Sequence, residues 1–214
     1  MSFQHTLKIP KDRIGAIIGK QGKVKQQIEK RCGVAIEIDS DSGDATITGT
    51  KPVEQMEAFK AVEVITAISR GFSPERAYRL FEDDEVLFQQ VDLRDYAGRS
   101  PSALERIKGR IIGEGGKARR TIEELSGAHV SVYGHMVGVI GNFHEVKLAT
   151  DSIAMLAKGS MHKTVYNMLQ EARRRDKMDR MRLWEDNYDY ENAQERAEEG
   201  EEEEEGEEIR PSES

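Results

Sequence analysis

Hydrophobic and polar residues follow the same succession of patterns in two halves of this 214-residue chain. Apolar residues that alternate with polar ones indicate strands, whereas apolar residues spaced three and four apart indicate helices. The first half predicts strands at residues 7–9, 34–38 and 45–48 and helices at 12–18, 22–31 and 52–68. The second half predicts strands at 85–92, 129–133 and 136–140 and helices at 100–112, 117–127 and 143–156. Both halves therefore predict the element order β-α-α-β-β-α.

Residues that favour helix ends support several of these boundaries. Asp12 and Ser100 are predicted N-caps, and Pro101 occupies the first helical position after Ser100. Gly33 is suited to end the second helix because glycine tolerates a left-handed backbone. The third helix, opened by Pro52, is predicted to bury Val53, Met56, Phe59, Ala61, Val64, Ile65 and Ile68.

A glycine loop occurs once in each half, between the first two helices. The run Ile-Ile-Gly-Lys-Gln-Gly-Lys spans residues 17–23, and Ile-Ile-Gly-Glu-Gly-Gly-Lys spans residues 111–117. Glycine lets another backbone or a phosphate approach closely. The free N–H groups at the start of the following helix then face that phosphate, and the helix dipole adds to the attraction. The two loops predict two places at which a nucleic-acid backbone is held.

Repetition within one chain indicates one structural unit used twice. We predict a first domain at 1–69, a helical connector at 70–84, a second domain at 85–159, a basic C-terminal helix at 160–184 and a disordered acidic tail at 185–214. Tyr78, Leu80 and Phe81 make the connector apolar enough to pack and to hold the two domains at a fixed angle.

The net charge of −8 conceals a basic body. Residues 185–214 carry 15 acidic and 2 basic side chains, so the remaining 30 basic and 25 acidic side chains give residues 1–184 a net charge of +5. The cations are concentrated around the loops: residues 8–31 have a net charge of +6 and residues 94–120 a net charge of +5. Such a distribution is compatible with nucleic-acid binding.

Other classes of function find little support in the residues. Cys32 is the only cysteine, which excludes an intrachain disulfide and a cysteine-based zinc site. The five histidines lack paired ligand spacing, so we expect no metal and no cofactor. Neither loop has the earlier glycine, or the Ser or Thr after Gly-Lys, that the phosphate-binding motif of nucleoside triphosphatases requires. We therefore expect no catalytic residues and no enzyme. No apolar run reaches membrane-spanning length, and the N-terminus lacks signal-peptide features, so a cytoplasmic location is expected.

The element order, with Ile-Ile-Gly-x-x-Gly between the first two helices, resembles the type I KH domain. Two such units, with the strings at residues 92–98 and 103–113, resemble the archaeal and eukaryotic two-KH assembly factor of the small ribosomal subunit. The resemblance covers about residues 1–175 and implies an α+β fold of two tandem KH domains. Each would have a three-stranded antiparallel sheet with helices on one face. It also implies binding to the 3′ region of small-subunit rRNA and cooperation with the maturation endonuclease.

In KH domains the loop clamps about four nucleotides of single-stranded RNA, and the bases enter a groove between helix and strand. In the first copy the residues predicted to bind RNA are Gly19, Lys20, Gln21, Gly22, Lys23 and Lys25. Ile17, Ile18, Ile28 and Ile36 are candidates for the apolar groove, and at least half of them are expected to be core residues instead.

The second copy differs at Glu114, where a carboxylate would oppose a phosphate. Gly115 gives the loop additional freedom, and cations lie on both sides. The residues predicted to bind RNA here are Arg106, Lys108, Arg110, Ile112, Gly113, Glu114, Gly115, Gly116, Lys117, Arg119 and Arg120. Arginine binds phosphates in a bidentate manner and stacks on bases. We therefore expect the RNA strand at this loop to shift away from Glu114, toward the cations of the two flanking helices.

Two functions of different classes remain open. In the first, the protein is a monomeric RNA-binding assembly factor. In the second, it is chiefly a scaffold whose KH surfaces recruit the endonuclease or a translation initiation factor. The residues do not assign these roles to the two domains, whereas the family resemblance favours rRNA at the second domain and leaves the first open to a protein partner. Base preference and the role of the acidic tail are not predicted.

Overall fold

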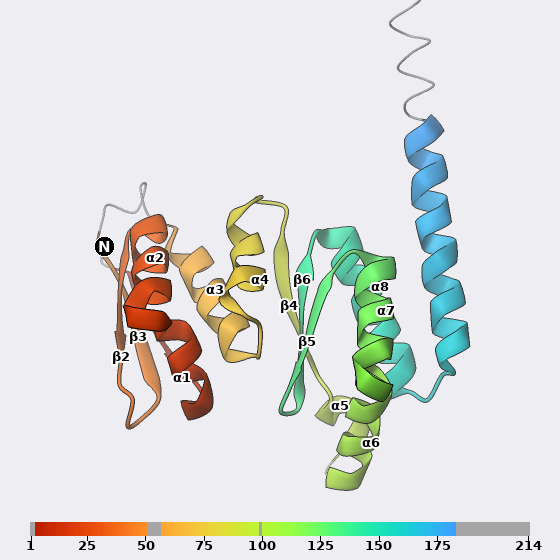
Figure 1. Cartoon of the computed structure of the whole chain (residues 1–214), viewed down its shortest axis with the longest axis horizontal. Coiled ribbons are helices and arrows are strands. Elements are labelled where there is room, and N and C mark those ends of the chain that lie inside the picture. Colours follow the sequence, from red (N-terminus) through yellow and green to blue (C-terminus); the bar gives the residue numbers. More distant parts are fainter. Residues whose placement is uncertain (1–2, 51–56, 99, 183–214) are drawn as a thin grey trace, which may run out of the picture. The chain divides into compact units, whose positions relative to one another are not determined.

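The computed structural model describes residues 3–50, 57–98 and 100–182 (Figure 1). The elements of the first domain are β1 (Gln4–Lys8), α1 (Lys11–Ile18), the 3₁₀ turn η1 (Lys20–Gly22), α2 (Lys23–Cys32), β2 (Val34–Ile38), β3 (Asp44–Gly49) and α3 (Ala58–Ser69). The three strands form an antiparallel sheet in the order β1-β3-β2, and the helices cover one face of it. The predicted element order is confirmed.

The second domain repeats this arrangement with one addition. Its elements are β4 (Leu87–Asp92), α5 (Arg94–Ala97), α6 (Pro101–Ile112), the 3₁₀ turn η4 (Glu114–Gly116), α7 (Lys117–Ser126), β5 (His129–Tyr133), β6 (Met136–Gly141) and α8 (Phe143–Ala157). The sheet order is β4-β6-β5, again antiparallel. The short helix α5 was not predicted, and its four residues are too few to show a helical period.

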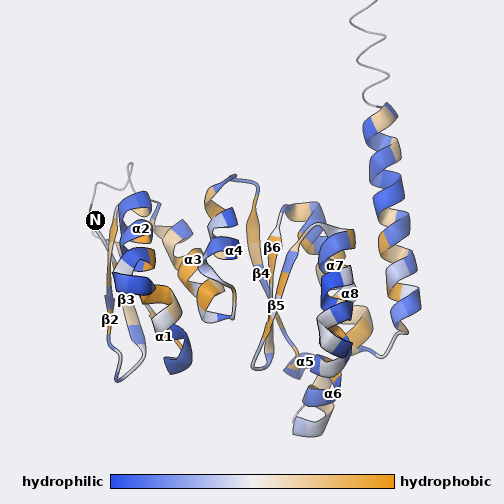
Figure 2. Ribbon diagram, in the orientation of Figure 1, coloured by the Kyte–Doolittle hydropathy of each residue, from blue (hydrophilic) through white to orange (hydrophobic). Residues whose placement is uncertain are grey.

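The cores lie where the sheets meet their helices. Figure 2 shows hydrophobic residues concentrated in α3 and in the strands of the second sheet. In the first domain Ile17, Ile28 and Ile36 are at most 1% exposed, so three of the four proposed groove isoleucines are core residues, and Ile18 is half-buried. This agrees with the expectation that at least half of them pack inside.

Two sequence-based assignments in the first domain were wrong. Asp12 does not cap α1, because the helix begins at Lys11 and Pro10 is its N-cap residue, which leaves Asp12 in the first turn. Phe59 is 78% exposed instead of buried. Its ring packs edge-on against Phe3, with 5.4 Å between centroids, at the outside of the domain. The assigned residues Pro52, Val53 and Met56 lie outside the described residues.

Two short helical segments lie between α3 and β4, in the predicted connector. They are α4 (Pro74–Ala77), whose N-cap Ser73 accepts a hydrogen bond from Arg76, and the 3₁₀ turn η3 (Tyr78–Phe81). Phe72, just after α3, lies against Phe88 of β4 with 6.3 Å between ring centroids. A β-carbon on Gly138 of β6 would lie 2.7 Å from the Phe72 ring, so this glycine admits the aromatic side chain. The connector region therefore contacts the sheet face opposite the second domain's helices.

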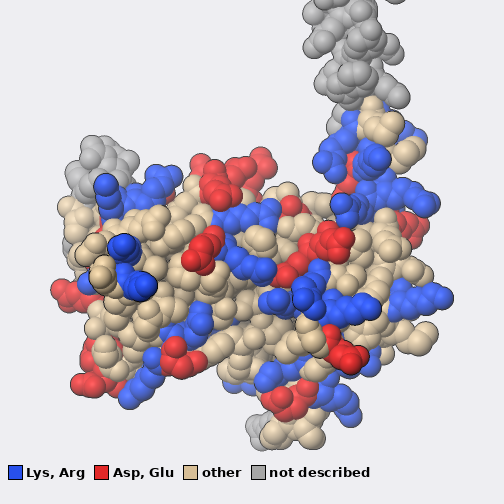
Figure 3. Space-filling model, in the orientation of Figure 1, with Lys and Arg blue, Asp and Glu red and all other residues tan. Residues whose placement is uncertain are grey.

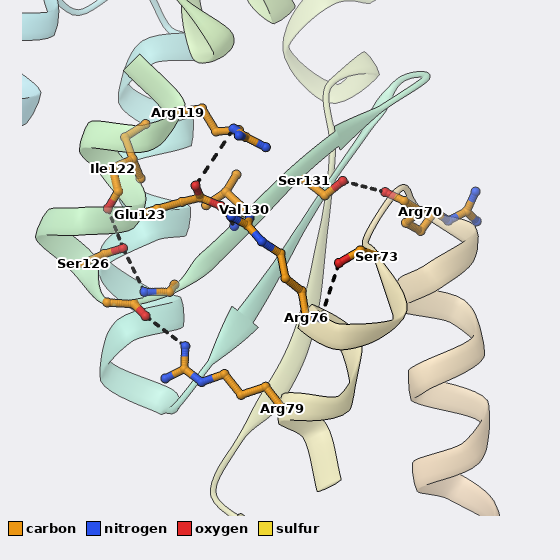
Figure 4. A network of polar contacts seen from close by, with 12 residues as sticks. Arg70, Ser73, Arg76, Arg79, Arg119, Ile122, Glu123, Ser126, Val130 and Ser131 are labelled. Carbon is orange, nitrogen blue, oxygen red and sulfur yellow. Dashed lines mark hydrogen bonds and ion pairs between the residues drawn. The ribbon is translucent and has the colours of Figure 1, made fainter. Parts of the chain in front are cut away.

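Polar contacts reinforce this junction (Figure 4). Arg76 forms an ion pair with Glu123 of α7 at 2.7 Å. Arg79 forms a second ion pair, with Glu145 of α8 at 2.7 Å, and donates to the carbonyl of Gly127. The Ser131 hydroxyl donates to the carbonyl of Arg70 at 3.1 Å. Arginine is suited to this task because its planar fork can serve a carboxylate and a carbonyl together.

Residues 162–182 are helical, in agreement with the predicted C-terminal helix. Val165 and Leu169 are fully buried in the core of the second domain. Residues 170–182 are the described part of a second unit that begins at Gln170, and the predicted acidic tail lies outside the described residues. Within the described part of the chain, no helix combines the length and the apolar character that a membrane crossing requires.

Candidate nucleic-acid interface

The first glycine loop has a backbone that ordinary residues rarely adopt. Gly19 has φ 71° and ψ 178°, Gln21 has φ 55° and ψ 30°, and Gly22 has φ 75° and ψ 8°. Gln21 is the only non-glycine residue with positive φ in the described chain, and such a conformation costs about 1–2 kcal/mol for an L-residue. The loop is therefore held in a strained, defined shape directly before α2.

The second loop reproduces this shape residue for residue. Gly113 has φ 71° and ψ 175°, Gly115 has φ 57° and ψ 21°, and Gly116 has φ 77° and ψ 15°. Gly115 thus occupies the left-handed position that Gln21 holds in the first loop. The extra glycine relieves backbone strain, and Glu114 stands where the first loop has Lys20.

The outer glycines of each loop have different physical roles. A β-carbon on Gly19 would lie 2.3 Å from Val24 Cγ2, and one on Gly113 would lie 2.6 Å from Ala118 Cβ. These first glycines let the loop fold tightly against the next helix. Around Gly116 no atom lies within 4 Å of an added β-carbon, and around Gly22 the nearest atom is 3.7 Å away. The last glycines therefore keep open the space in front of the helix, which is where a phosphate backbone would pass.

The N-termini of α2 and α7 open onto that space. The N-cap residues Gly22 and Gly116 have no side chain with which to cap the first N–H groups. The backbone N–H of Lys23 donates to the carbonyl of Lys20, and that of Lys117 donates to the carbonyl of Glu114. The N–H groups without such a partner in the first turn, together with the positive end of the helix dipole, attract an anion. Around the first loop Lys20 and Lys23 are exposed, while Lys25 is half-buried with its ammonium 3.8 Å from Glu29.

The second loop has its cations on the flanks. Lys117, Arg120 and Arg106 are exposed, and Glu114 is exposed among them. Arg120 reaches back and donates to the carbonyl of Gly115 at 2.8 Å, which holds a cation over the loop. Ile112 and Arg119 are half-buried, and Arg119 lies 4.0 Å from Glu123. Figure 3 shows Lys and Arg side chains gathered over the second domain, with acidic ones interspersed.

Arg110 and Lys108 are engaged within the protein. The Arg110 guanidinium donates to the carbonyl of Leu156 at 3.1 Å and to that of Ser160, at the end of α8. In the first domain Arg13 does the same at the end of α3, donating to Ile68 at 2.9 Å and to Phe72 at 2.6 Å. Because both arginines join carbonyls four residues apart, we assign Arg110 a structural role and leave it out of the proposed RNA contacts.

Lys108 is half-buried, and its ammonium lies 2.7 Å from Glu105. The pair belongs to the surface of α6, where exposed ion pairs contribute little to stability. An ammonium so placed remains able to exchange its partner for a phosphate.

A glutamate in each domain fixes the helix that follows the loop. Glu29 of α2 accepts a hydrogen bond from the backbone N–H of Ile36, and Glu123 of α7 accepts one from that of Val130, both at 2.8 Å. These bonds join the helix to the edge strand that forms the other wall of a KH groove. The sequence shows both glutamates at equivalent repeat positions, which was the available signal for their role. Among the described residues, no group of three or more His, Cys, Asp or Glu side chains is placed to hold a metal ion.

Comparisons with known proteins agree with this geometry. Residues 4–62 match the KH domain family, and residues 87–174 match the eukaryotic-type KH domain, KH-domain type I. A KH domain-containing protein of Methanocaldococcus jannaschii is 44% identical over 191 residues, which is 89% of this chain and 83% of that protein.

Two further relatives are linked to rRNA, one by its name and the other by the complex in which it was solved. The pre-rRNA-processing protein PNO1 of Chaetomium thermophilum is 26% identical over 164 residues. The matched region covers 76% of this chain and 63% of that protein. The Dim2p of Pyrococcus horikoshii, solved in a complex with rRNA and a/eIF2alpha, is 44% identical with a TM-score of 0.74, covering 81% of this chain and 95% of that one. This chain therefore belongs to the two-KH-domain PNO1/Dim2 family of RNA-binding proteins that act in rRNA processing.

Proposed function

We propose that this protein binds single-stranded RNA from the 3′ region of small-subunit rRNA and acts as an assembly factor of that subunit. The observation that carries the proposal is the pair of glycine loops with matching backbone angles, each open in front of a helix that has no side-chain cap. The rRNA in the complex of the related Dim2p supports the same class of ligand.

The two loops would grip the strand in different ways. At the first, the phosphates run along residues 19–22, where Lys20 and Lys23 add charge to the N–H groups of α2. At the second, Glu114 repels a phosphate from the tip of the loop. The strand is therefore held nearer to Lys117, Arg119 and Arg106. Bases would enter the groove between the helix and the edge strand, as in other KH domains.

We further propose that the protein is not an enzyme and that cleavage of the rRNA is performed by a partner endonuclease. In this scheme the protein positions the single strand and recruits the nuclease. A cytoplasmic, monomeric protein is consistent with this role.

A second candidate function is that of a docking scaffold. The a/eIF2alpha in the complex of the related Dim2p favours it, because one family member assembles with a translation factor as well as with RNA. The two functions are compatible if one domain binds RNA and the other binds protein. The first domain is then the one we propose for the protein partner.

Fluorescence anisotropy with a labelled strand from the 3′ end of small-subunit rRNA tests the RNA proposal. A scrambled strand of equal length is the control, and a salt titration measures the phosphate contribution, because such contacts weaken as salt rises. Preferential binding of the native strand is expected. Equal, weak binding of both strands would overturn the rRNA proposal in favour of the scaffold.

A further inference from the structure

A second concave site lies on the first domain, away from its glycine loop. A groove of about 520 Å³ runs between α2 and the connector, and we call it the α2–connector groove. Its lining residues are Gln27, Lys30 and Arg31 of α2 and Tyr78, Phe81 and Glu82 of the connector. The volume lies within the range of about 300–1,000 Å³ that small-molecule sites occupy. Its α2 residues belong to the C-terminal half of the helix, whereas the glycine loop precedes its first residue.

The connector supplies an aromatic wall with one unused polar atom. The rings of Tyr78 and Phe81 are stacked, with centroids 5.8 Å apart and an interplanar angle of 27°. The Tyr78 hydroxyl is buried and has no hydrogen-bond partner among the described residues. A buried hydroxyl without a partner is costly, so a rotation of the Tyr78 side chain that brings the hydroxyl to a hydrogen-bond acceptor of a ligand in the groove would be favoured. Burial raises the pKa of Tyr78, and the phenol therefore stays protonated and able to donate.

Helix α2 supplies the cations. Lys30 is exposed, and Arg31 keeps half of its side-chain surface exposed although its guanidinium lies 3.4 Å from Glu57. An aromatic surface beside Lys and Arg is the combination that proteins use to stack a base and hold its phosphate. Neither cation belongs to the residues assigned to the glycine loop.

The remaining lining residues can form hydrogen bonds along the edge of a base. The Glu82 carboxylate accepts hydrogen bonds only, while the Gln27 amide both donates and accepts. A carboxylate matches a base that presents adjacent N–H donors, and guanine has two of them on its pairing edge. The phenol of Tyr78 can donate to a carbonyl or ring-nitrogen acceptor of the same base.

We propose that the α2–connector groove is a nucleotide-binding site that prefers guanine. The base lies against the aromatic wall, with its edge toward Glu82 and the Tyr78 hydroxyl, and the phosphate lies beside Lys30 and Arg31. The nucleotide is either a free nucleoside phosphate or one unit of an RNA strand, since both present the same chemistry.

Isothermal titration calorimetry of the full chain with GMP, AMP, CMP and UMP tests the site directly. Saturable binding with GMP as the tightest ligand is expected. Tyr78→Phe keeps the ring and removes only the hydroxyl, and it should weaken binding about 2- to 10-fold, as the loss of one hydrogen bond does. Glu82→Gln should abolish the preference for GMP over AMP. Lys30→Ala should weaken the binding of all four nucleotides. Lys11→Ala, an exposed lysine of α1, is the matched control and should change nothing.

Photo-crosslinking of the same protein to a guanine-containing RNA strand identifies the source of the nucleotide. Crosslinks to the peptide that contains Tyr78 and Phe81, diminished by excess GMP, would assign the site to a unit of the strand. GMP binding without such crosslinks would assign it to a free nucleotide. The variant Gly22→Asp/Gly116→Asp separates this site from the glycine loops, because it should retain GMP binding even if the RNA proposal above fails.

Absence of saturable binding of all four nucleotides at millimolar concentrations, together with absence of crosslinks to this peptide, would overturn the proposal. Binding that is unaffected by both Tyr78→Phe and Lys30→Ala would also overturn it, because the nucleotide would then occupy another place. A groove that binds only a partner protein, and no nucleotide, would contradict it in the same way.

Discussion

The Tyr133 hydroxyl donates to the carboxylate of Asp12, 121 residues away, with 2.7 Å to each carboxylate oxygen. Tyr133 ends β5 of the second domain, and Asp12 lies in the first turn of α1 in the first. The bond therefore joins the two KH domains directly, beside the contacts made by the connector. Asp12 is not an N-cap, but its carboxylate accepts a hydrogen bond between the two domains.

Replacing Tyr133 with Phe should lower the free energy of unfolding by about 1–2 kcal/mol, because a hydrogen bond to a charged group is lost at a partly exposed position. Asp12→Asn should have a similar effect, and the double variant should cost less than the sum of the two. Urea unfolding of the four proteins measures this coupling. Tyr96→Phe, a half-buried tyrosine of α5, is the control. Additive effects would show that the bond does not couple the domains.

The same bond predicts a loss of stability at alkaline pH. Burial and the neighbouring carboxylate of Asp12 raise the pKa of Tyr133 above its usual value of about 10. A raised pKa in the folded state means that the stabilisation is fully present below about pH 10 and is lost as the pH rises through the folded pKa. The wild-type protein should therefore lose stability above that pH more steeply than Tyr133→Phe. Unfolding curves at increasing pH, compared between the two proteins, check this.

Cys32 should be unreactive in the folded protein. It is 1% exposed, and burial, followed by the charge of Glu57, raises its pKa to about 12. Since the thiolate is the reactive species, alkylation by iodoacetamide at pH 8 should proceed only after unfolding in urea. The neutral thiol stabilises the fold below about pH 9, and this contribution declines as the pH approaches about 12. Rapid labelling of the native protein would contradict the packing of α2.

The sequence predicted the repeat, the element order and the loops because each depends on local signals. Alternation, helical spacing and the need for glycine at positive φ are all set within a few residues. The two roles of the loop glycines were not predicted. The difference between Gly113 and Gly116 arises from where Ala118 lies, which depends on how the helix folds back.

Contacts between residues far apart in the chain could not be predicted from the sequence. Nothing local to Arg110 shows that it binds carbonyls at residues 156 and 160, so its charge suggested an RNA contact. Phe59 was assigned to the core from helical spacing alone, whereas the described helix starts at Ala58 and leaves that ring on the outside. For Phe59 tertiary packing overrode the helical pattern, whereas the RNA contact of Arg110 stays a prediction that its carbonyl contacts argue against.

Glu29 and Glu123, which bind the backbone N–H groups of the edge strands, should differ in their contributions to the free energy of unfolding. Glu29→Ala removes the acceptor of one backbone N–H and should cost about 1–3 kcal/mol. Glu123→Ala removes the equivalent acceptor and also leaves Arg76 without its ion-pair partner at the domain junction, so it should cost more. Urea unfolding of the two variants compares them. Equal losses would mean that the Arg76 pair contributes nothing measurable.

Substitutions at the two outer glycines of the second loop should affect different properties, stability at Gly113 and RNA binding at Gly116. Gly113→Ala forces a β-carbon against Ala118 and should cost about 1–3 kcal/mol of stability. Gly116→Asp meets no neighbouring atom, so the fold should persist despite some backbone strain at φ 77°, while its carboxylate should abolish RNA binding at this loop. Circular dichroism and fluorescence anisotropy report the two properties. Unchanged RNA affinity in folded Gly116→Asp would show that the loop does not grip the backbone.

The structural assignment of Arg110 can be tested against Lys117. Arg110→Ala removes two hydrogen bonds at the end of α8 and should lower stability by about 1–3 kcal/mol. Arg13→Ala, its counterpart at the end of α3, should behave similarly. Lys117→Ala removes an exposed cation beside the loop. It should leave stability within about 0.5 kcal/mol of wild type, because surface substitutions rarely do more.

The RNA affinities should show the opposite order. Lys117→Ala should weaken binding and reduce the slope of log affinity against log salt by about 1, because one phosphate contact is lost. Arg110→Ala, assayed where it remains folded, should keep the wild-type slope. A reduced slope together with unchanged stability in Arg110→Ala would return that arginine to the RNA-binding surface, since a guanidinium that held only carbonyls would not release counterions from the RNA.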